Sequence, residues 1–92
     1  MNLRNAAILS ALVVTSTLLA VSLARAQSCE DLWVERNAIY KQAGYCFKTR
    51  RAIAYFGNSG CSYDTEESVP LSSRQRARIA RITAEERAQG CR

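Results

Sequence analysis

The apolar residues after position 26 recur with helical spacing in three stretches. They fall on one face of residues 29–43 and of residues 50–56, and a narrower apolar stripe runs through residues 72–89. No stretch alternates between apolar and polar residues in the way that a half-buried strand does. The pattern therefore predicts a small all-α domain of three helices joined by short links.

Capping signals mark the ends of these stretches. A hydroxyl side chain suits each start, and Ser72 with Gln75 has the pattern of a capping box. Glycine follows each last turn, where a left-handed residue ends a helix. Glu30 and Asp31 favour the first helix because they lie at the positive end of its dipole. The predicted N-caps are Ser28, Thr49 and Ser72, and the predicted stops are Gly44, the turn 57–60 and Gly90.

Large apolar side chains are few, so we expect most of them in the core. Trp33 and Phe56 are assigned there, although Trp33 and the tyrosines could instead form a flat platform for sugar rings. Tyr63 suits the core and the surface equally. The expected apolar faces are Leu32, Ile39 and Ala43 in the first stretch, Ala52, Ile53 and Phe56 in the second, and Ile79 and Ile82 in the third.

The first 26 residues have the pattern of a secretory signal peptide. Arg4 makes the start basic, residues 6–23 are uncharged, and Ala24 and Ala26 supply the small residues of a cleavage site. We expect cleavage after Ala26, which leaves a domain of residues 27–92 in the periplasm or outside the cell. Contact with the membrane would then be transient. An uncleaved anchor, or a lipoprotein attached at Cys29, is the alternative.

Four cysteines lie in the predicted domain, at positions 29, 46, 61 and 91. An even number in a short exported chain indicates disulfides, and so small a domain needs them because it buries little apolar surface. A zinc site is the alternative. It is disfavoured because the cysteines are widely spaced and the chain has no histidine.

Helix geometry limits how these cysteines pair. A helix over residues 29–43 is about 20 Å long, whereas the Cα atoms of a disulfide lie within about 7 Å of each other. Cys29 and Cys46 should therefore not pair. Antiparallel packing of the first and third helices favours Cys29–Cys91 with Cys46–Cys61, and Cys29–Cys61 with Cys46–Cys91 is the alternative.

A motif spans residues 36–47, around the end of the first predicted helix. Its notable residues are Arg36, Asn37, Ile39, Tyr40, Gly44, Tyr45 and Phe47. In this order they resemble the signature of the YARHG domain family. The pair Tyr55–Phe56 and the arginine-rich helix with Ile79, Ile82 and Glu86 resemble later parts of the same family. Residues 41–43, Lys-Gln-Ala, replace its Ala-Arg-His. The resemblance implies an extracellular or periplasmic domain that binds rather than catalyses.

The motif also has a structural interpretation. We expect Arg36 to bury its stem and to donate to carbonyl groups at a helix end, and Asn37 to bond the backbone of a following loop. The aromatic residues would then pack around the turn at Gly44. Contact with a ligand is the alternative role for these residues.

The charge balance is basic but moderate. Arg4 and Arg25, two of the 13 basic residues, would leave with the signal peptide, which lowers the net charge from +5 to about +3. We therefore expect no nucleic-acid partner. Two groups of arginines are candidates for contact with an anionic partner, although each could be an ordinary solvated surface: Arg74, Arg78 and Arg81 on one face of the third helix, and Arg50 and Arg51 at the start of the second.

Nothing in the sequence predicts catalysis or a cofactor. Paired cysteines provide no thiolate, and the chain has no histidine to act as a base. The acidic residues are expected on the solvated surface: Glu30, Asp31, Glu35, Asp64, Glu66, Glu67, Glu85 and Glu86. We predict a non-enzymatic exported binding module for an envelope polymer or a protein partner. A small inhibitor or effector of another protein is the alternative, and a hydrolase is a more remote one.

Overall fold

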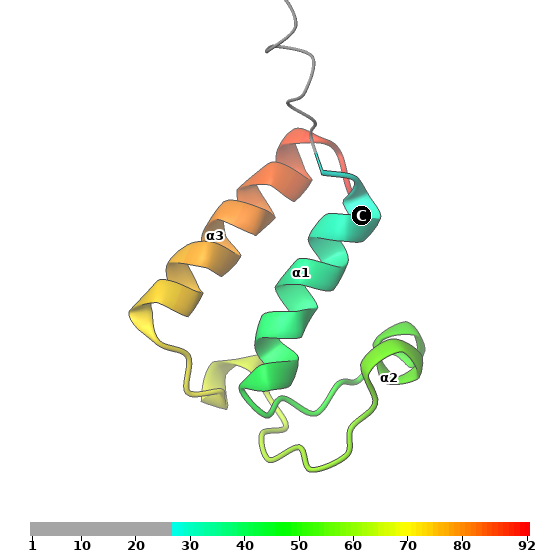
Figure 1. Ribbon diagram of the computed structural model, residues 1–92, viewed down its shortest axis with the longest axis vertical. Coiled ribbons are helices and arrows are strands. Elements are labelled where there is room, and N and C mark those ends of the chain that lie inside the picture. The colour runs from blue at the N-terminus through cyan, green and yellow to red at the C-terminus, as the bar shows by residue number, and fades with distance from the viewer. Residues whose placement is uncertain (1–26) are drawn as a thin grey trace, which may run out of the picture.

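The computed structural model describes residues 27–92, so the predicted signal peptide lies outside the described residues. The elements in chain order are α1 (Cys29–Gln42), α2 (Arg50–Phe56), a short 3-10 turn η4 (Glu66–Ser68) and α3 (Ser73–Ala88). In Figure 1, α1 is central, α3 lies beside it, and α2 lies on its other side. The predicted all-α fold of three helices is confirmed, and none of the helices in this part of the chain is long and apolar enough to cross a membrane.

The start of α1 is fixed by reciprocal hydrogen bonds. The Ser28 hydroxyl accepts from the backbone N–H of Asp31 at 3.0 Å, and the Asp31 carboxylate accepts from the backbone N–H of Ser28 at 3.3 Å. Ser28 was predicted as the N-cap, and the second bond makes this start a full capping box. These bonds satisfy two backbone donors that a helix start otherwise leaves without a partner.

The end of α1 depends on Gly44. Its φ of +93° is strained for other residues, and a Cβ at this position would lie 3.3 Å from two ring atoms of Tyr63. The Gly44 carbonyl accepts from the backbone N–H groups of Ser62 and Tyr63, at 2.8 and 3.0 Å. This close approach places Tyr63 against the core. Of the two positions that the sequence left open, core and surface, the structure therefore favours the core.

The other two helices begin where the sequence predicts. Thr49 accepts from the backbone N–H of Ala52 at 3.1 Å and caps α2. Ser72 and Gln75 form the predicted capping box of α3, with bonds of 3.1 and 2.8 Å. Both starts are local features, since each cap bonds a residue three positions further along the chain.

The main core fills the space between α1 and α3. Leu32, Ile39 and Ile82 pack there with Val69 and Leu71, two residues that come from the link before α3. The sequence analysis assigned no core residue to that link. Because Val69 and Leu71 flank Pro70, an extended segment rather than a helix closes this end of the core.

α2 is oriented differently from the prediction. Ala52 is buried as expected, but Ile53 is 42% exposed and does not belong to the apolar face. Trp33 and Phe56, which were expected in the core, are only half-buried. α2 therefore attaches to the domain through Ala52 and Phe56, and leaves Ile53 in contact with solvent.

Two disulfides close the fold with the pairing that helix geometry favoured. Cys29–Cys91 joins the start of α1 to the residues after α3, with the Cα atoms 5.5 Å apart. Cys46–Cys61 encloses α2, with the Cα atoms 5.1 Å apart. Because all four cysteines are bonded to one another, none provides a thiolate for zinc.

Candidate functional site

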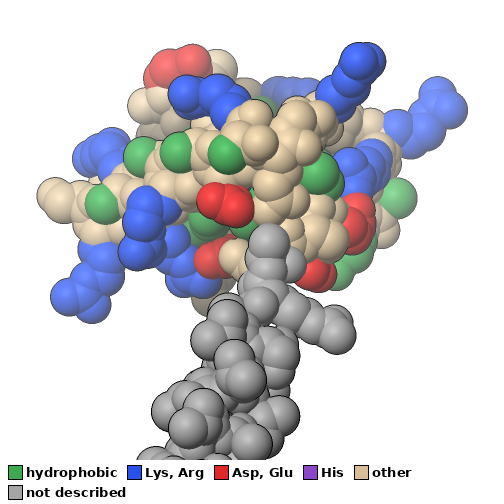
Figure 2. Space-filling model, turned by 90° about the horizontal axis from the view of Figure 1, so that it is seen from above, with side chains coloured by type: hydrophobic (Ala, Val, Ile, Leu, Met, Phe, Trp, Pro, Cys, Tyr) green, Lys and Arg blue, Asp and Glu red, His purple; other side chains and the backbone are tan. Residues whose placement is uncertain are grey.

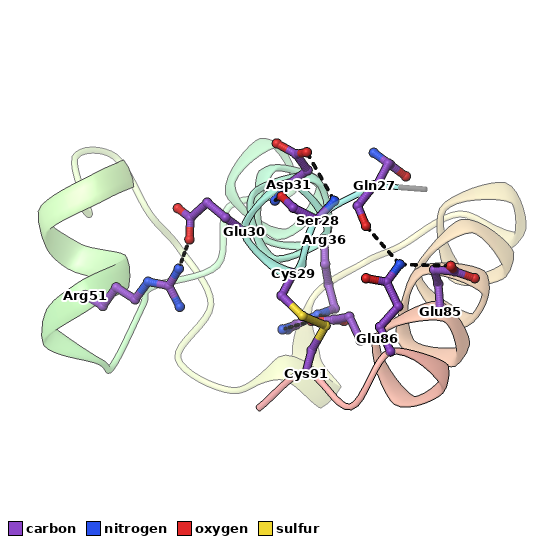
Figure 3. Close-up of a disulfide and its surroundings, with 11 residues drawn as sticks. Gln27, Ser28, Cys29, Glu30, Asp31, Arg36, Arg51, Glu85, Glu86 and Cys91 are labelled. Carbon is purple, nitrogen blue, oxygen red and sulfur yellow. Dashed lines mark hydrogen bonds and ion pairs between the residues drawn. A yellow bond between two sulfur atoms is a disulfide. The ribbon is translucent and has the colours of Figure 1, made fainter. Parts of the chain in front are cut away.

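Arg36 of the motif connects α1 to α3. Its Nε donates to Glu86 Oε1 at 2.7 Å and its Nη2 to Glu86 Oε2 at 3.1 Å, a bidentate ion pair next to the Cys29–Cys91 disulfide (Figure 3). Two expectations were wrong here. Arg36 donates to a carboxylate rather than to carbonyl groups, and the Glu86 side chain is only 13% exposed rather than solvated. The reason is that the antiparallel packing of α3 brings Glu86 next to Arg36.

Asn37 also has a different partner from the one expected. Its Nδ2 donates to the carbonyl oxygen of Trp33 at 2.9 Å, one turn earlier in the same helix, and not to a following loop. The residue is buried, so this bond satisfies a polar group that would otherwise be costly to bury. The role of Asn37 is therefore internal to α1.

The remaining motif residues pack around the turn after α1. Ile39 and Phe47 are buried, and the rings of Tyr40, Tyr45 and Phe47 follow one another at centroid distances of 5.7 and 5.2 Å. Asn58 holds Phe47 in place, because its side-chain amide accepts from the Phe47 N–H at 2.7 Å and donates to the Phe47 carbonyl at 3.0 Å. The sequence analysis treated Asn58 only as a turn residue.

We expect Glu86→Gln to lower the free energy of unfolding by about 2 kcal/mol. The substitution keeps the shape of the side chain but removes the charge that balances Arg36 in a mostly buried position. Chemical denaturation followed by circular dichroism measures the loss. Glu85→Gln, on the exposed neighbour, is the matched control and should change stability by less than about 0.5 kcal/mol. Equal losses in the two variants would contradict a structural role for the Arg36–Glu86 pair.

The two arginines of α2 differ in their contacts. The Arg51 guanidinium lies 3.7 Å from the centroid of the Trp33 ring and forms an ion pair with Glu30. Arg50 is exposed and has no carboxylate within ion-pair distance among residues 27–92. Arg51 is therefore engaged in contacts within the fold, whereas Arg50 has no ion pair among the described residues.

The arginines of α3 are exposed, as a partner-binding face requires. Arg78 donates to Glu35 of α1, with Nη2 at 3.0 Å from Oε1. Arg74 and Arg81 have no ion-pair partner in the described part of the chain. We call Arg74, Arg78 and Arg81 the arginine face, and it lies apart from α2 because the two helices flank α1 on different sides (Figure 1).

Glu35 is the acidic group that this arrangement perturbs most clearly. Hydrogen bonds from the Gln27 side chain and from Arg78 hold the pKa of Glu35 below its usual value, with Arg81 adding to the effect. A lowered pKa in the folded state stabilises the domain at neutral pH, and that contribution is lost as the pH falls through the pKa. A general acid would need a raised pKa instead.

The surface of the described residues 27–92 has several open hollows. One, of about 310 Å³, lies between α1, α3 and η4 and is lined by Arg36, Tyr40, Glu66 and Glu86, among others. Burial and the nearby Glu66 carboxylate raise the pKa of the Tyr40 hydroxyl, so this phenol stays protonated at neutral pH. Arg36 and Glu86 neutralise each other, and the hollow also carries the charged side chains of Glu66, Arg87 and Arg92.

Comparisons with known proteins place the chain in a family. The family model described as YARHG domain matches residues 6–87, which is most of the chain. Searches of curated proteins and of solved structures found no match. The family match agrees with the motif of residues 36–47, whose side chains hold α1, the following turn and α3 together. This chain therefore belongs to the YARHG domain family.

Proposed function

We propose that this domain is a non-enzymatic binding module that engages anionic polymers of the cell envelope through the arginine face of α3. The two disulfides and the YARHG domain both indicate an extracellular or periplasmic location. Polymers of that compartment carry phosphate and carboxylate groups, which guanidinium groups bind through paired hydrogen bonds.

The observation that carries the proposal is the excess of exposed arginine on α3. This helix has no acidic residue in its first turn, where Arg74 and Arg76 lie against the direction that the helix dipole favours. These charges therefore contribute little to folding, whereas they would attract an anionic partner. In Figure 2, Lys and Arg side chains project from the outer edges of the domain on the sides of both α3 and α2.

The arginine face is available without any change in the fold. α3 packs on α1 through Ile82 and the half-buried Ile79, and its arginines are all exposed. Arg78 keeps about half of its side chain accessible even in its pair with Glu35. A polymer can therefore bind here while the core and the Arg36–Glu86 pair stay intact.

Several features support a binding role over a catalytic one. The cysteines are bonded in disulfides, the chain has no histidine, and the pKa of Glu35 is shifted in the direction opposite to that of a general acid. Glu86, which Arg36 holds, serves as a link between helices. These groups stabilise the fold, and the exposed arginines remain accessible to a binding partner.

The test is retention of the purified domain on isolated peptidoglycan, with and without attached teichoic acid, at low and high salt. We expect retention at low salt that falls at high salt. Replacing Arg74 and Arg81 together by Gln should reduce the bound fraction about three- to tenfold. The charge-matched control replaces Arg76 and Arg87, which lie elsewhere around α3.

Two outcomes would count against the proposal. The domain would fail to be retained at low salt on either preparation, or both double variants would lose the same bound fraction. The second result would mean that net charge alone, rather than the arginine face, governs retention.

A further inference from the structure

We propose that Glu35 of α1 is an internal competitor of the anionic polymer, because it holds Arg78 of the arginine face until a ligand takes its place. The inference rests on the proposed function and deepens it, since it concerns how tightly the same surface binds. It gives a carboxylate outside α3 control over the affinity of that helix. Polymer binding then includes an exchange, in which Arg78 leaves Glu35 and turns to an anionic group of the ligand.

Glu35 occupies one edge of the Arg78 guanidinium. Arg78 Nε donates to Glu35 Oε1 at 3.2 Å, and Arg78 Nη2 donates to the same oxygen at 3.0 Å. A phosphate or carboxylate group forms its paired hydrogen bonds with two neighbouring N–H groups of this kind. Because Glu35 already uses the Nε and Nη2 groups, a polymer reaches that edge of Arg78 only by displacing the carboxylate.

The Glu35 carboxylate is held in place by a second partner. Its Oε2 accepts from Gln27 Nε2 at 2.9 Å, and the Gln27 carbonyl oxygen accepts from Gln89 Nε2 at 2.8 Å. The side chain of Glu35 is 26% exposed, whereas that of Arg78 is 51% exposed. The acid is therefore the anchored member of the pair, and the arginine is the member that can turn to a ligand.

The charge of Glu35 acts on more of the arginine face than Arg78. Hydrogen bonds from Gln27 and Arg78 are the main causes of the lowered pKa of Glu35, and the charge of Arg81 adds to them. An electrostatic interaction of this kind is mutual. The carboxylate therefore offsets part of the positive potential that Arg78 and Arg81 present to a polymer.

The exchange of partners does not require a change in the fold. An ion pair with an exposed member contributes little to stability, because water solvates the charges and salt screens them. The packing of α3 on α1 depends instead on the buried Ile82 and on the bidentate Arg36–Glu86 pair. Arg78 can therefore leave Glu35 while the two helices stay together.

Glu35→Gln tests the inference on the purified, oxidised domain. The amide keeps the size of the side chain but has no negative charge to hold Arg78. We expect this variant to bind peptidoglycan with attached teichoic acid about three- to fivefold more tightly than the wild type at low salt.

Glu30→Gln is the matched control. Glu30 lies on the same helix and also holds an arginine, Arg51 of α2, which lies apart from the arginine face. The two substitutions change the net charge equally, so a gain that depended on net charge alone would be the same in both. We expect Glu30→Gln to bind less than about 1.5-fold more tightly than the wild type.

Glu35→Gln/Arg78→Gln shows whether the gain comes from the released arginine. This double variant has the net charge of the wild type but lacks both members of the pair. We expect it to bind the polymer no more tightly than the wild type does. Circular dichroism of all the variants checks that the fold is intact.

A measurement without polymer tests the pair itself. The Nε–H group of Arg78 gives a side-chain NMR signal, and a hydrogen-bonded N–H group exchanges slowly with water. The neutral amide of Glu35→Gln is a weaker acceptor than the carboxylate. We therefore expect the exchange at Arg78 Nε to be faster in Glu35→Gln than in the wild type and in Glu30→Gln.

The outcomes separate this inference from the proposed function. If the wild type is retained but Glu35→Gln binds no more tightly than Glu30→Gln, the inference fails and the proposed function stands. The same holds if Glu35→Gln/Arg78→Gln binds as tightly as Glu35→Gln, or if the exchange at Arg78 Nε is unchanged. If neither the wild type nor Glu35→Gln is retained at low salt, the proposed function fails and the inference falls with it.

Discussion

Replacing Cys29 and Cys91 together by Ser should lower the free energy of unfolding by about 4 kcal/mol. The bond joins residues 62 positions apart, so its loss gives the unfolded chain much additional freedom. A domain of this size has a total stability of only about 5 kcal/mol, so the variant should keep only a small free energy of unfolding. Thermal and urea unfolding, followed by far-ultraviolet circular dichroism, measure the effect.

The second disulfide provides the matched comparison. Cys46–Cys61 spans 15 positions, and its removal should cost about 3 kcal/mol, less than the loss of Cys29–Cys91. Both double variants replace two cysteines by serine, so the chemical change is the same. If the variant without Cys46–Cys61 were the less stable of the two, loop length would not govern the stabilisation.

Leu32→Ala should be the most damaging substitution within the core, with a loss of about 3 kcal/mol. Leu32 is only 1% exposed and packs between α1, α3 and the link that carries Val69 and Leu71. So few residues form this core that the neighbours have little freedom to fill the space left by the leucine. Urea unfolding of the oxidised protein checks the value.

Ile53→Ala is the control for that loss. It removes an aliphatic side chain from a helix, as Leu32→Ala does, but at a position that is largely exposed. We expect a change below about 0.5 kcal/mol. A loss at Ile53 comparable to that at Leu32 would show that α2 is packed more tightly than its exposure indicates.

The features that the sequence predicted well are local ones. Ser28, Thr49 and Ser72 cap the three helices because each bonds a backbone group three residues further on, whatever the rest of the chain does. The disulfide pairing followed from the length of one helix and from its antiparallel packing. The caps needed only the spacing of residues along the chain, whereas the Cys29–Cys91 pair, 62 positions apart, also needed the assumed antiparallel packing of the first and third helices.

Most of the mispredicted features depend on distant partners, and the exception is Asn37, which bonds Trp33 one turn earlier. Arg36 lies 50 positions from Glu86, and nothing near either residue shows that they form a pair. Ile53 and Phe56 have similar apolar character, and which of them faces the domain depends on how α2 is rotated against Trp33. The signal that could have identified the Arg36 partner was Glu86 itself, which was noted as part of the family-like helix but assigned to the surface.

The candidate binding surfaces were predicted in part. The arginines at positions 74, 78 and 81 were grouped correctly on one face, because helical spacing determines which residues share a side. The sequence did not indicate that Arg78 pairs with Glu35 or that Arg51 covers Trp33. These contacts show which arginines are engaged within the fold and which remain accessible. They could be recognised only from the tertiary structure.

The two disulfides are nested, since the ring closed by Cys46–Cys61 lies wholly inside the one closed by Cys29–Cys91. α2 belongs to the inner ring and contributes a single buried residue, Ala52. We therefore expect this helix to open more readily than the α1–α3 pair, so its amide hydrogens should exchange with solvent sooner. The inner ring can also change its exposed sequence with little penalty for the rest of the domain, which makes it the segment best suited to acquire new specificities.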